Sequence, residues 1–366
     1  MNISFKNITR AFFVSALSVA FLSGCSKWTE PKSIKFEYLT LEQKNPELFQ
    51  AYMESLREYR DSDHKVVIAK FDNSSSTPSG RAEHINCVPD SVDYVVLVNP
   101  SEVSDQLLAD MEDLQVNKKT EVFGQISISD ILESYKLYKE QWMENHSDDP
   151  AAEGDVEVEE MLSYDAFISQ QMPLLMEPFK KYPFDGINII YYGQNPENLT
   201  EEKAEVAKTE QQAFFSPIME WVNAKEGRKY FIEGTPQYLL LEDDLASKAE
   251  FILVPAQSAQ VLSEFTHVVN KVLSEKNVPS DKIVVVVTTI DLNDPTIKNG
   301  HFSDVHSDGS SMTAIEGAAF WSVSTYKNIT PRGIAIDHAQ NDYFNLKMVY
   351  SETRSAISIM NPSPLK

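Results

Sequence analysis

The sequence predicts a single α/β domain, a closed (β/α)8 TIM barrel that follows a short N-terminal helical leader. Eight short apolar runs, most of them β-branched and nearly continuous, follow residue 64. Such runs are typical of strands that are buried on both faces of a parallel sheet. Helix-like stretches lie between the runs and give the alternation of strand and helix found in βαβ units. Eight units of this kind favour a closed barrel.

An open, doubly wound sheet is the alternative, but it does not need eight strands. The motifs G-x-G-x-x-G and G-x-x-x-x-G-K-[ST], which mark nucleotide sites in such sheets, occur nowhere among the 12 glycines. We therefore predict the barrel and expect no nucleotide cofactor.

The elements are expected in the following order. A helical pattern over 46–60 lies in a leader that covers residues 25–64, and the barrel fills 65–366. Its strands are predicted at 65–72, 92–99, 120–127, 184–192, 228–235, 250–257, 282–290 and 332–338. Helices are predicted between them at 104–114, 201–224, 259–275 and 343–359. The stretch 144–160 has eight acidic residues and no Lys or Arg, which predicts a solvated insertion after the third strand.

Residues 1–24 are predicted to be a signal peptide. Lys6 and Arg10 precede an apolar run over 11–22, which is too short to span a bilayer and is typical of a secretory signal. Leu22-Ser23-Gly24-Cys25 resembles a bacterial lipobox, which implies cleavage after residue 24 and a lipid on Cys25. A plain signal peptide followed by a coincidental cysteine is the alternative. With Cys25 lipidated, only Cys87 remains, so no intramolecular disulfide is expected.

The chain is strongly acidic. It has 32 Lys plus Arg against 55 Asp plus Glu, a formal net charge of −23. Binding to phosphate backbones needs a basic face, so the charge excludes nucleic acid as a partner. The same charge disfavours strongly anionic polymers as ligands.

Polar and aromatic residues follow the predicted strands at the barrel end where chemistry takes place in this fold. These strand ends are Asp72-Asn73, Asn99, Gln125-Ile126-Ser127, Tyr191-Tyr192, Glu233-Gly234-Thr235, Gln257, Thr288-Thr289 and Asp337-His338. Strand ends also meet water and are polar for that reason alone. No single residue of this set therefore identifies a site.

The fourth predicted strand is more informative. Its sequence FDGINIIYYG, at 184–193, resembles the signature strand of family-eighteen glycoside hydrolases, the chitinase and endo-β-N-acetylglucosaminidase family, whose pattern is D-G-x-D-x-D-x-E. The Asp-Gly pair matches. The second aspartate of the pattern falls on Asn188, the third on Ile190 and the catalytic glutamate on Tyr192.

The resemblance extends over residues 30–366. The chain is similar to the degenerate branch of this family found among lipoproteins of glycan-uptake systems in gut bacteria. In active relatives the glutamate protonates the leaving oxygen, and the preceding aspartate orients the substrate's own N-acetyl group. Ile190 cannot orient that group, and a tyrosine with a pKa near 10 is poorly matched to general-acid work at neutral pH. We therefore expect the family mechanism to be lost and predict no catalytic residue.

The resemblance also implies a cleft that binds sugars. Alternation along the strand puts Asn188, Ile190 and Tyr192 on one face, toward the barrel mouth. Tyr191 and Tyr192 are expected to stack on pyranose rings, and Asn188 and Gln125 to form hydrogen bonds with hydroxyl groups.

Three further residues are assigned to this cleft. Glu233 and Asp337 are predicted to line it from other strand ends. Trp321, in the stretch Ala-Ala-Phe-Trp that precedes the eighth strand, stands where relatives often have an aromatic floor beneath the sugar. It is either a sugar platform or a buried core residue.

No metal site is predicted. The stretch 304–309 imitates the start of an EF-hand loop, but Ile315 stands where the bidentate glutamate is needed, so we expect a polar surface loop. His301 and His306 lack the helical spacing of a zinc site.

Three functions remain open. The first, which we favour, is a non-catalytic lipoprotein on the surface of a bacterial outer membrane that holds N-acetylglucosamine-containing or mannose-rich glycans for other glycan-uptake proteins. The second is an active glycosidase in which Glu233 or Asp337 serves as a relocated acid. The third is a scaffold that binds proteins of an outer-membrane complex, with 144–160 as a contact.

Overall fold

The structure is a computed structural model that describes residues 41–75, 77–146, 160–241, 244–275, 277–291, 294 and 296–362. The predicted signal peptide, Cys25 and most of the acidic stretch 144–160 lie outside these residues. The chain divides into two units, 1–51 and 52–366, and the division falls within helix α3 (Pro46–Asp61). Among the described residues, no helix has the length and apolar character needed to cross a membrane.

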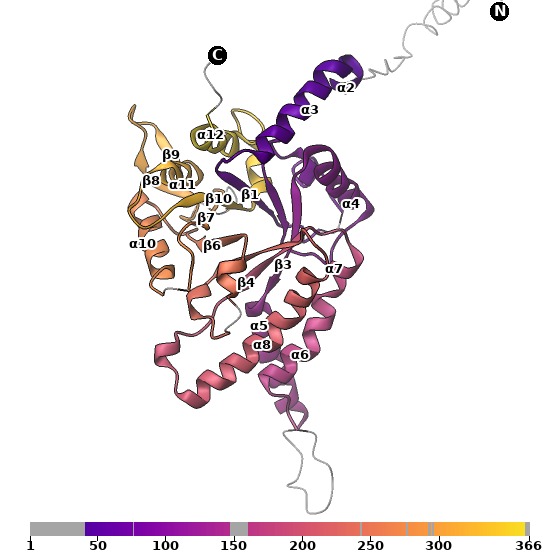
Figure 1. Ribbon diagram of the computed structural model, residues 1–366, viewed down its shortest axis with the longest axis vertical. Coiled ribbons are helices and arrows are strands. Elements are labelled where there is room, and N and C mark those ends of the chain that lie inside the picture. The colour runs from indigo at the N-terminus through magenta and orange to yellow at the C-terminus, as the bar shows by residue number, and fades with distance from the viewer. Residues whose placement is uncertain are drawn as a thin grey trace, which may run out of the picture. The chain divides into compact units, whose positions relative to one another are not determined.

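Eight parallel strands close into a barrel in the order β1-β10-β7-β6-β5-β4-β3-β2 (Figure 1). They are β1 (Val66–Phe71), β2 (Tyr94–Leu97), β3 (Glu121–Ser127), β4 (Gly186–Tyr191), β5 (Lys229–Gly234), β6 (Phe251–Pro255), β7 (Ile283–Thr288) and β10 (Pro331–Asp337). Each overlaps one of the eight apolar runs. The prediction of a (β/α)8 barrel is therefore confirmed.

Helices surround the barrel and connect its strands. They are α4 (Asp105–Glu112), α5 (Ile128–Asn145), α6 (Tyr164–Leu175), α7 (Glu177–Lys181), α8 (Glu201–Asn223), α9 (Leu245–Lys248), α10 (Leu262–Val272), α11 (Ala314–Val323) and α12 (Ser351–Met360), and a four-residue helix α2 (Leu41–Lys44) precedes α3. The helix predicted at 343–359 is α12 with part of the short 3₁₀ helix Ala339–Phe344 before it.

The connection after β7 differs from the prediction. Residues 306–309 of the expected polar surface loop form the turn of an antiparallel hairpin, and the strands on either side of it, β8 (His301–Val305) and β9 (Ser311–Thr313), were not predicted. Gly309 supports the turn with a φ of 81°, a conformation that glycine adopts without strain. The hairpin leads directly into α11, which begins with a capping box of Thr313 and Glu316.

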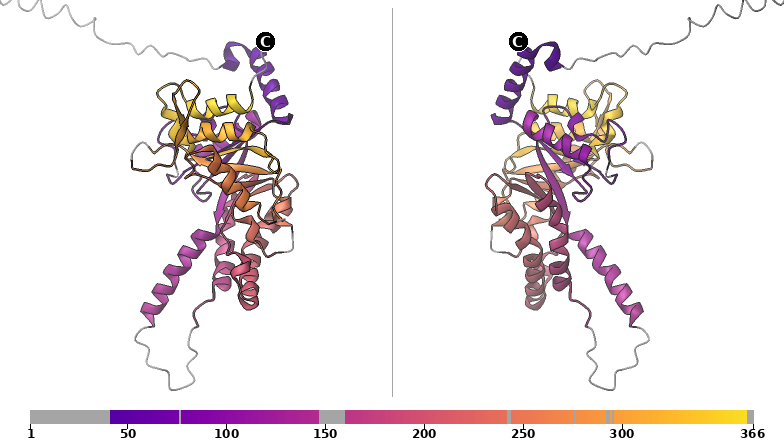
Figure 2. Two further views of the ribbon diagram at one scale, coloured as in Figure 1. Left: turned by 90° about the vertical axis from the view of Figure 1, so that its left-hand side faces the viewer. Right: turned by 90° about the vertical axis from the view of Figure 1, so that its right-hand side faces the viewer.

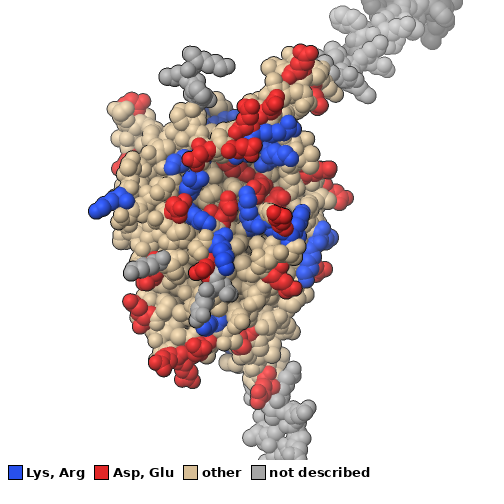
Figure 3. Space-filling model, viewed as in Figure 1, with Lys and Arg blue, Asp and Glu red and all other residues tan. Residues whose placement is uncertain are grey.

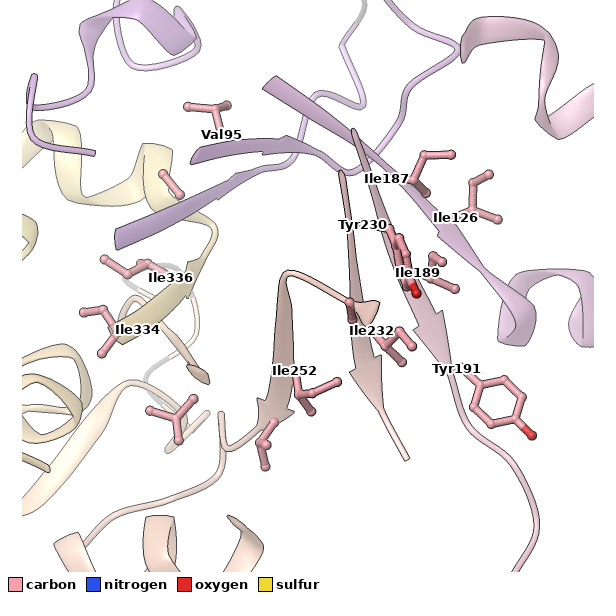
Figure 4. Close-up of a cluster of buried hydrophobic side chains, with 14 of the residues drawn as sticks. Val95, Ile126, Ile187, Ile189, Tyr191, Tyr230, Ile232, Ile252, Ile334 and Ile336 are labelled. Atoms are coloured by element: carbon pink, nitrogen blue, oxygen red, sulfur yellow. The ribbon is translucent and has the colours of Figure 1, made fainter. Parts of the chain in front are cut away.

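Alternation along the strands separates two layers of core. Inward-facing side chains fill the barrel, and their cluster contains Val66, Ile68, Tyr94, Val96, Phe123, Phe231, Phe251, Leu253, Val284, Val286 and Ala335. Phe123 and Phe231 stack with ring centroids 4.4 Å apart, and Tyr94 meets both rings edge-on. Outward-facing residues such as Ile187 and Ile189 pack in the larger cluster beneath the helices (Figure 4).

Helix α3 ends against the amino ends of the barrel strands. Arg60 donates hydrogen bonds to the Asp93 carboxylate, to the backbone oxygens of Asp90 and Val92, and to the Thr120 hydroxyl. Arg60 thus joins the end of the helix to the segments that lead into β2 and β3.

The Asp-Gly pair of the signature strand lies at the same end of the barrel. Asp185 Oδ2 accepts hydrogen bonds from the Val122 backbone nitrogen at 2.9 Å and from Gln115 Nε2 at 2.7 Å. Gly186 faces inward, where a Cβ atom would overlap the Phe123 ring and lie 2.5 Å from the Lys229 backbone oxygen. Both residues therefore position β4 and its neighbours.

We predict that Gly186→Ala lowers the free energy of unfolding by about 1–3 kcal/mol, because overpacking forces the Phe123 ring or the backbone to move. Urea unfolding measures the change. Gly80→Ala is the matched control, since a Cβ atom at Gly80 meets nothing within 4 Å. Equal stability of the two variants would contradict the tight packing assigned to Gly186.

Candidate functional site

A layer of polar side chains lies above the aromatic layer, toward the carboxyl ends of the barrel strands. Lys70 of β1, Gln125 of β3, Asn188 of β4, Glu233 of β5 and Asp337 of β10 all occupy inward-facing positions, because each follows an inward-facing position of its strand by two residues. Strand alternation thus gathers at one end residues that are far apart in the sequence.

Three of these residues form a buried ion triad. Lys70 Nζ lies 3.0 Å and 2.8 Å from the two oxygens of Glu233 and 2.8 Å from Asp337 Oδ1. Burial by itself lowers the pKa of Lys70, but the negative charges of Glu233 and Asp337 and their hydrogen bonds outweigh it, so its pKa is raised. Lys70 therefore stays charged, and the two carboxylates offset the cost of burying its ammonium group.

Amide side chains complete the hydrogen bonding of both carboxylates. Asn188 Nδ2 donates to Glu233 Oε2 at 2.8 Å and to Gln125 Oε1 at 3.3 Å, and Gln257 Nε2 donates to Asp337 Oδ2 at 2.7 Å. Asn188 is fully buried, yet its Oδ1 has no hydrogen-bond partner among the described residues. This oxygen is a free acceptor within the polar layer.

Tyr192 follows β4 and is exposed over 50% of its surface. Burial of the remainder raises the pKa of its hydroxyl above the ordinary value of 10, and the charge of Glu233 raises it further, while Lys70 acts in the opposite direction. The hydroxyl therefore keeps its proton at neutral pH and can donate a hydrogen bond. Tyr192 offers both a ring face and a donor to a ligand at the mouth.

Neighbouring backbone holds Tyr192 in place. Gly234 has a φ of 115°, and a Cβ atom there would overlap the Tyr191 backbone oxygen and lie 3.2 Å from the Tyr192 ring. Thr235 accepts a hydrogen bond from the Gly193 nitrogen at 2.9 Å and donates its own backbone N–H to the Tyr191 oxygen at 2.8 Å. The ends of β4 and β5 are thereby joined around the tyrosine.

The prediction that Tyr191 stacks on a sugar is wrong. Tyr191 shares the outward face of β4 with Ile187 and Ile189 (Figure 4) and is only 2% exposed. Its ring packs on Phe215 of α8, and its hydroxyl accepts a hydrogen bond from Gln211 at 2.6 Å. Alternation therefore gives only one of the two adjacent tyrosines to the mouth.

Trp321 is a buried core residue and not a sugar platform. The side chain is 0% exposed within α11, and its Nε1 donates to the Thr266 hydroxyl at 3.0 Å. Its ring contacts Phe265 and Tyr326. Trp321 stabilises the helix layer and cannot be a sugar platform.

Sequence reasoning missed Lys70. The sequence does contain a sign of its role. A lysine interrupts the otherwise apolar strand β1, two residues after Ile68, and therefore on the face of the strand that points into the barrel. A buried lysine requires a partner, and the strand ends that carry Glu233 and Asp337 could have supplied one.

The site suits neutral polar ligands more than metal ions. No group of three or more His, Cys, Asp or Glu in the described part of the chain is arranged to hold a metal. The groups that it exposes are instead the ring and hydroxyl of Tyr192 and the partly exposed carboxylate of Asp337.

Comparison with known proteins gives a family match and several similar folds. Residues 29–359 match the family described as Glycoside hydrolase family 18, BT1044-like. A solved structure of BT1044, in the form of a selenomethionine-labelled glutamate-to-glutamine variant, is 18% identical and has a TM-score of 0.59, over 88% of this chain and 96% of that one. A GH18 chitinase from Pseudoalteromonas aurantia is 11% identical with a TM-score of 0.45, over 81% and 100% of the two chains.

A chitinase-like agglutinin from Robinia pseudoacacia is 10% identical with a TM-score of 0.42, over 80% and 98% of the two chains. No curated protein matches the sequence. The family match covers most of the chain and agrees with the closed barrel and with the position of the Asp-Gly pair on its fourth strand. The chain therefore belongs to glycoside hydrolase family 18, in its BT1044-like group.

Proposed function

We propose that this protein binds glycans at the mouth of its barrel and does not hydrolyse them. The observation that carries the proposal is the identity of two residues on the inward face at the end of β4. Ile190 and Tyr192 stand where the family signature has its last aspartate and its glutamate. The mouth keeps groups that bind sugars and lacks the groups that break the glycosidic bond.

The physical chemistry of Tyr192 supports this proposal. A general acid works best when its pKa lies near the ambient pH, and burial moves the pKa of Tyr192 further from neutrality. Ile190 has no polar atom with which to orient an N-acetyl group. The substrate-assisted mechanism of the family lacks both of its carboxylates here.

The alternative of a relocated acid finds little support. Glu233 is only 3% exposed, and its two oxygens already accept hydrogen bonds from Lys70 and Asn188. Asp337 is more open, but Lys70 and Gln257 occupy its oxygens. Neither carboxylate is free to protonate a leaving group while the triad is intact.

We favour neutral glycans that contain N-acetylglucosamine or mannose, the ligand class that the family resemblance implies. The net charge of −23 repels anionic polysaccharides. On the face shown in Figure 3, Lys and Arg side chains are interspersed with Asp and Glu. The ring of Tyr192 suits the apolar faces of such sugars, and its hydroxyl can form a hydrogen bond with their polar groups.

The cellular setting is also proposed. The signal at 1–24 and a lipid on Cys25 would anchor the protein to a bacterial outer membrane, on the cell surface, beside other glycan-uptake proteins. Function as a protein scaffold is the second alternative, and a lack of binding to every glycan tested would favour it.

We predict that Tyr192→Ala weakens glycan binding by about 1–2 kcal/mol, roughly 5- to 30-fold, because the ligand loses a ring face and a hydrogen-bond donor. A glycan array identifies the ligand, and titration calorimetry measures its affinity for both proteins. Lys248→Ala, on α9, is the control and should bind like the wild type. Equal affinities for the two variants would remove Tyr192 from the site.

We predict that the purified protein releases no sugar from N-glycoproteins or chitin oligomers, since the family acid is absent. Mass spectrometry of the products tests this. Release that is abolished by Glu233→Gln or Asp337→Asn would show a relocated acid and overturn the non-catalytic assignment.

We predict that Lys70→Met lowers the free energy of unfolding by about 3–5 kcal/mol, because the buried Glu233 carboxylate and the partly exposed Asp337 carboxylate lose their counter-charge. The raised pKa of Lys70 sets the pH dependence. The stabilisation that Lys70 provides is fully present below the pKa of about 10.5 that its ammonium group has in the unfolded chain. It is lost as the pH rises toward the higher pKa that the group has in the folded protein. Urea unfolding at about pH 8 and about pH 11 should therefore show a smaller difference between variant and wild type at the higher pH. A difference that does not shrink would contradict the triad.

A further inference from the structure

A cavity of about 580 Å³ lies at the amino end of the barrel. Its lining includes Val66, Tyr94 and Phe251, the first residues of β1, β2 and β6, and Arg57 and Asp61 of α3. In both views of Figure 2, α5, which follows β3 at the mouth, projects to one side of the barrel, and the last turns of α3 lie on the other side. The cavity is therefore separate from the site at the mouth. Its volume is within the range of about 300–1,000 Å³ that is typical of ligand sites.

The side of this cavity that faces the barrel interior has a hydroxyl group without a partner. Tyr94 is only 7% exposed, and its ring packs edge-on against Phe123 and Phe231. The residue also lines the cavity, and its hydroxyl forms no hydrogen bond with any residue that the structure describes. Burial raises the pKa of this hydroxyl, and the charges of Glu121 and Glu250 raise it further. The hydroxyl therefore keeps its proton and is available to a ligand as a donor or an acceptor.

Charges of both signs line the cavity, and most of them already have partners in the protein. Arg60 pairs with Asp93, and Lys229 Nζ lies 2.6 Å from Glu121 Oε1. The same ammonium group is 4.0 Å from Glu250 Oε1, so one cation faces two carboxylates and Glu250 is only partly compensated. The other partnered groups are Arg332 with Asp63, His64 with Asp93, and Asp185 with Gln115 and the Val122 nitrogen.

Three further charged residues of the lining are unpaired. Arg57, Asp61 and Lys119 are exposed, and none of them forms an ion pair or a side-chain hydrogen bond within the described part of the chain. With Glu250, they leave cations and carboxylates in equal number open to the cavity. A ligand with charge of one sign would be repelled by half of these groups. A ligand that has an ammonium group and a carboxylate can pair with all of them.

The apolar part of the lining narrows the class of ligand further. Val66 and Phe251 line the cavity beside Tyr94, so an apolar or aromatic side chain of a ligand finds contacts there. A phosphate or sulfate group would meet the carboxylates of Asp61 and Glu250 in the same lining. A small molecule with both charges and an apolar side chain fits these groups best.

We propose that the amino end of the barrel is a second binding site that takes a small zwitterion of the size of an amino acid or a dipeptide. The carboxylate of the ligand pairs with Arg57 and Lys119, and its ammonium group pairs with Asp61 and Glu250. The Tyr94 hydroxyl supplies a further hydrogen bond. This site does not depend on the glycan binding proposed at the mouth.

Titration calorimetry with the purified protein tests the proposal. The probes are L-phenylalanine, L-leucine, glycyl-L-leucine and glycyl-L-phenylalanine. Two capped forms of the last probe are the matched controls for charge, because N-acetylglycyl-L-phenylalanine lacks the ammonium group and glycyl-L-phenylalanine amide lacks the carboxylate. We expect at least one dipeptide to bind, and each capped form to bind about tenfold more weakly than glycyl-L-phenylalanine.

Two variants locate the site. Tyr94→Phe removes only the hydroxyl and keeps the ring that packs in the barrel, and Lys119→Ala removes an exposed cation. Each should weaken the zwitterion about five- to tenfold. Lys203→Ala, at an exposed lysine of α8 outside this lining, is the matched control for Lys119→Ala and should bind like the wild type. Urea unfolding without ligand should give the same stability for Tyr94→Phe and the wild type, because the hydroxyl has no partner to lose.

The results either support the site or remove it. Weaker binding in Tyr94→Phe and Lys119→Ala, with normal binding in Lys203→Ala, supports it. A wild type that binds none of the four probes overturns the proposal, and so does binding that both variants retain in full. Equal affinity for the capped and the free dipeptide overturns the assignment of a zwitterion. None of these results bears on the glycan array, which tests the mouth separately.

Discussion

The ion triad of Lys70, Glu233 and Asp337 is the interaction on which the upper half of the barrel depends. It joins the neighbouring strands β1 and β10 to β5, which lies across the barrel from β1, through contacts of 2.8–3.0 Å. An ammonium group this deeply buried is tolerable only because two carboxylates face it. Asn188 donates a further hydrogen bond to Glu233 Oε2, and Gln257 donates to the Asp337 oxygen that Lys70 does not contact.

The layer below the triad explains why the polar groups lie so near the mouth. Tyr94, Phe123 and Phe231 fill the barrel interior with interlocking rings and leave little room for water. Phe123 fits because Gly186 has no side chain in its path. The ion triad thus lies beyond this aromatic layer, toward the carboxyl ends of the strands.

Local patterns made most of the fold predictable, whereas long-range pairing determined most of what was missed. All eight strands follow from their apolar runs, and alternation correctly turns Asn188 inward. The same alternation places Tyr191 on the outward face of β4, so this error was avoidable from the sequence, whereas the buried position of Trp321 depends on tertiary packing. Lys70 escaped notice because its partner Glu233 is 163 residues away. The hairpin before α11 depends in the same way on tertiary contacts.

The two ends of strand β4 serve different purposes. Asp185 and Gly186, at its amino end, hold neighbouring segments and leave room for an aromatic ring, while Ile190 and Tyr192 lie at its carboxyl end. A substitution at the carboxyl end of β4 can therefore change an activity while the packing at the amino end of the strand, which stabilises the fold, is kept. Selection for stability alone is enough to preserve Asp185 and Gly186, so the two ends of the signature strand can change independently of each other in evolution.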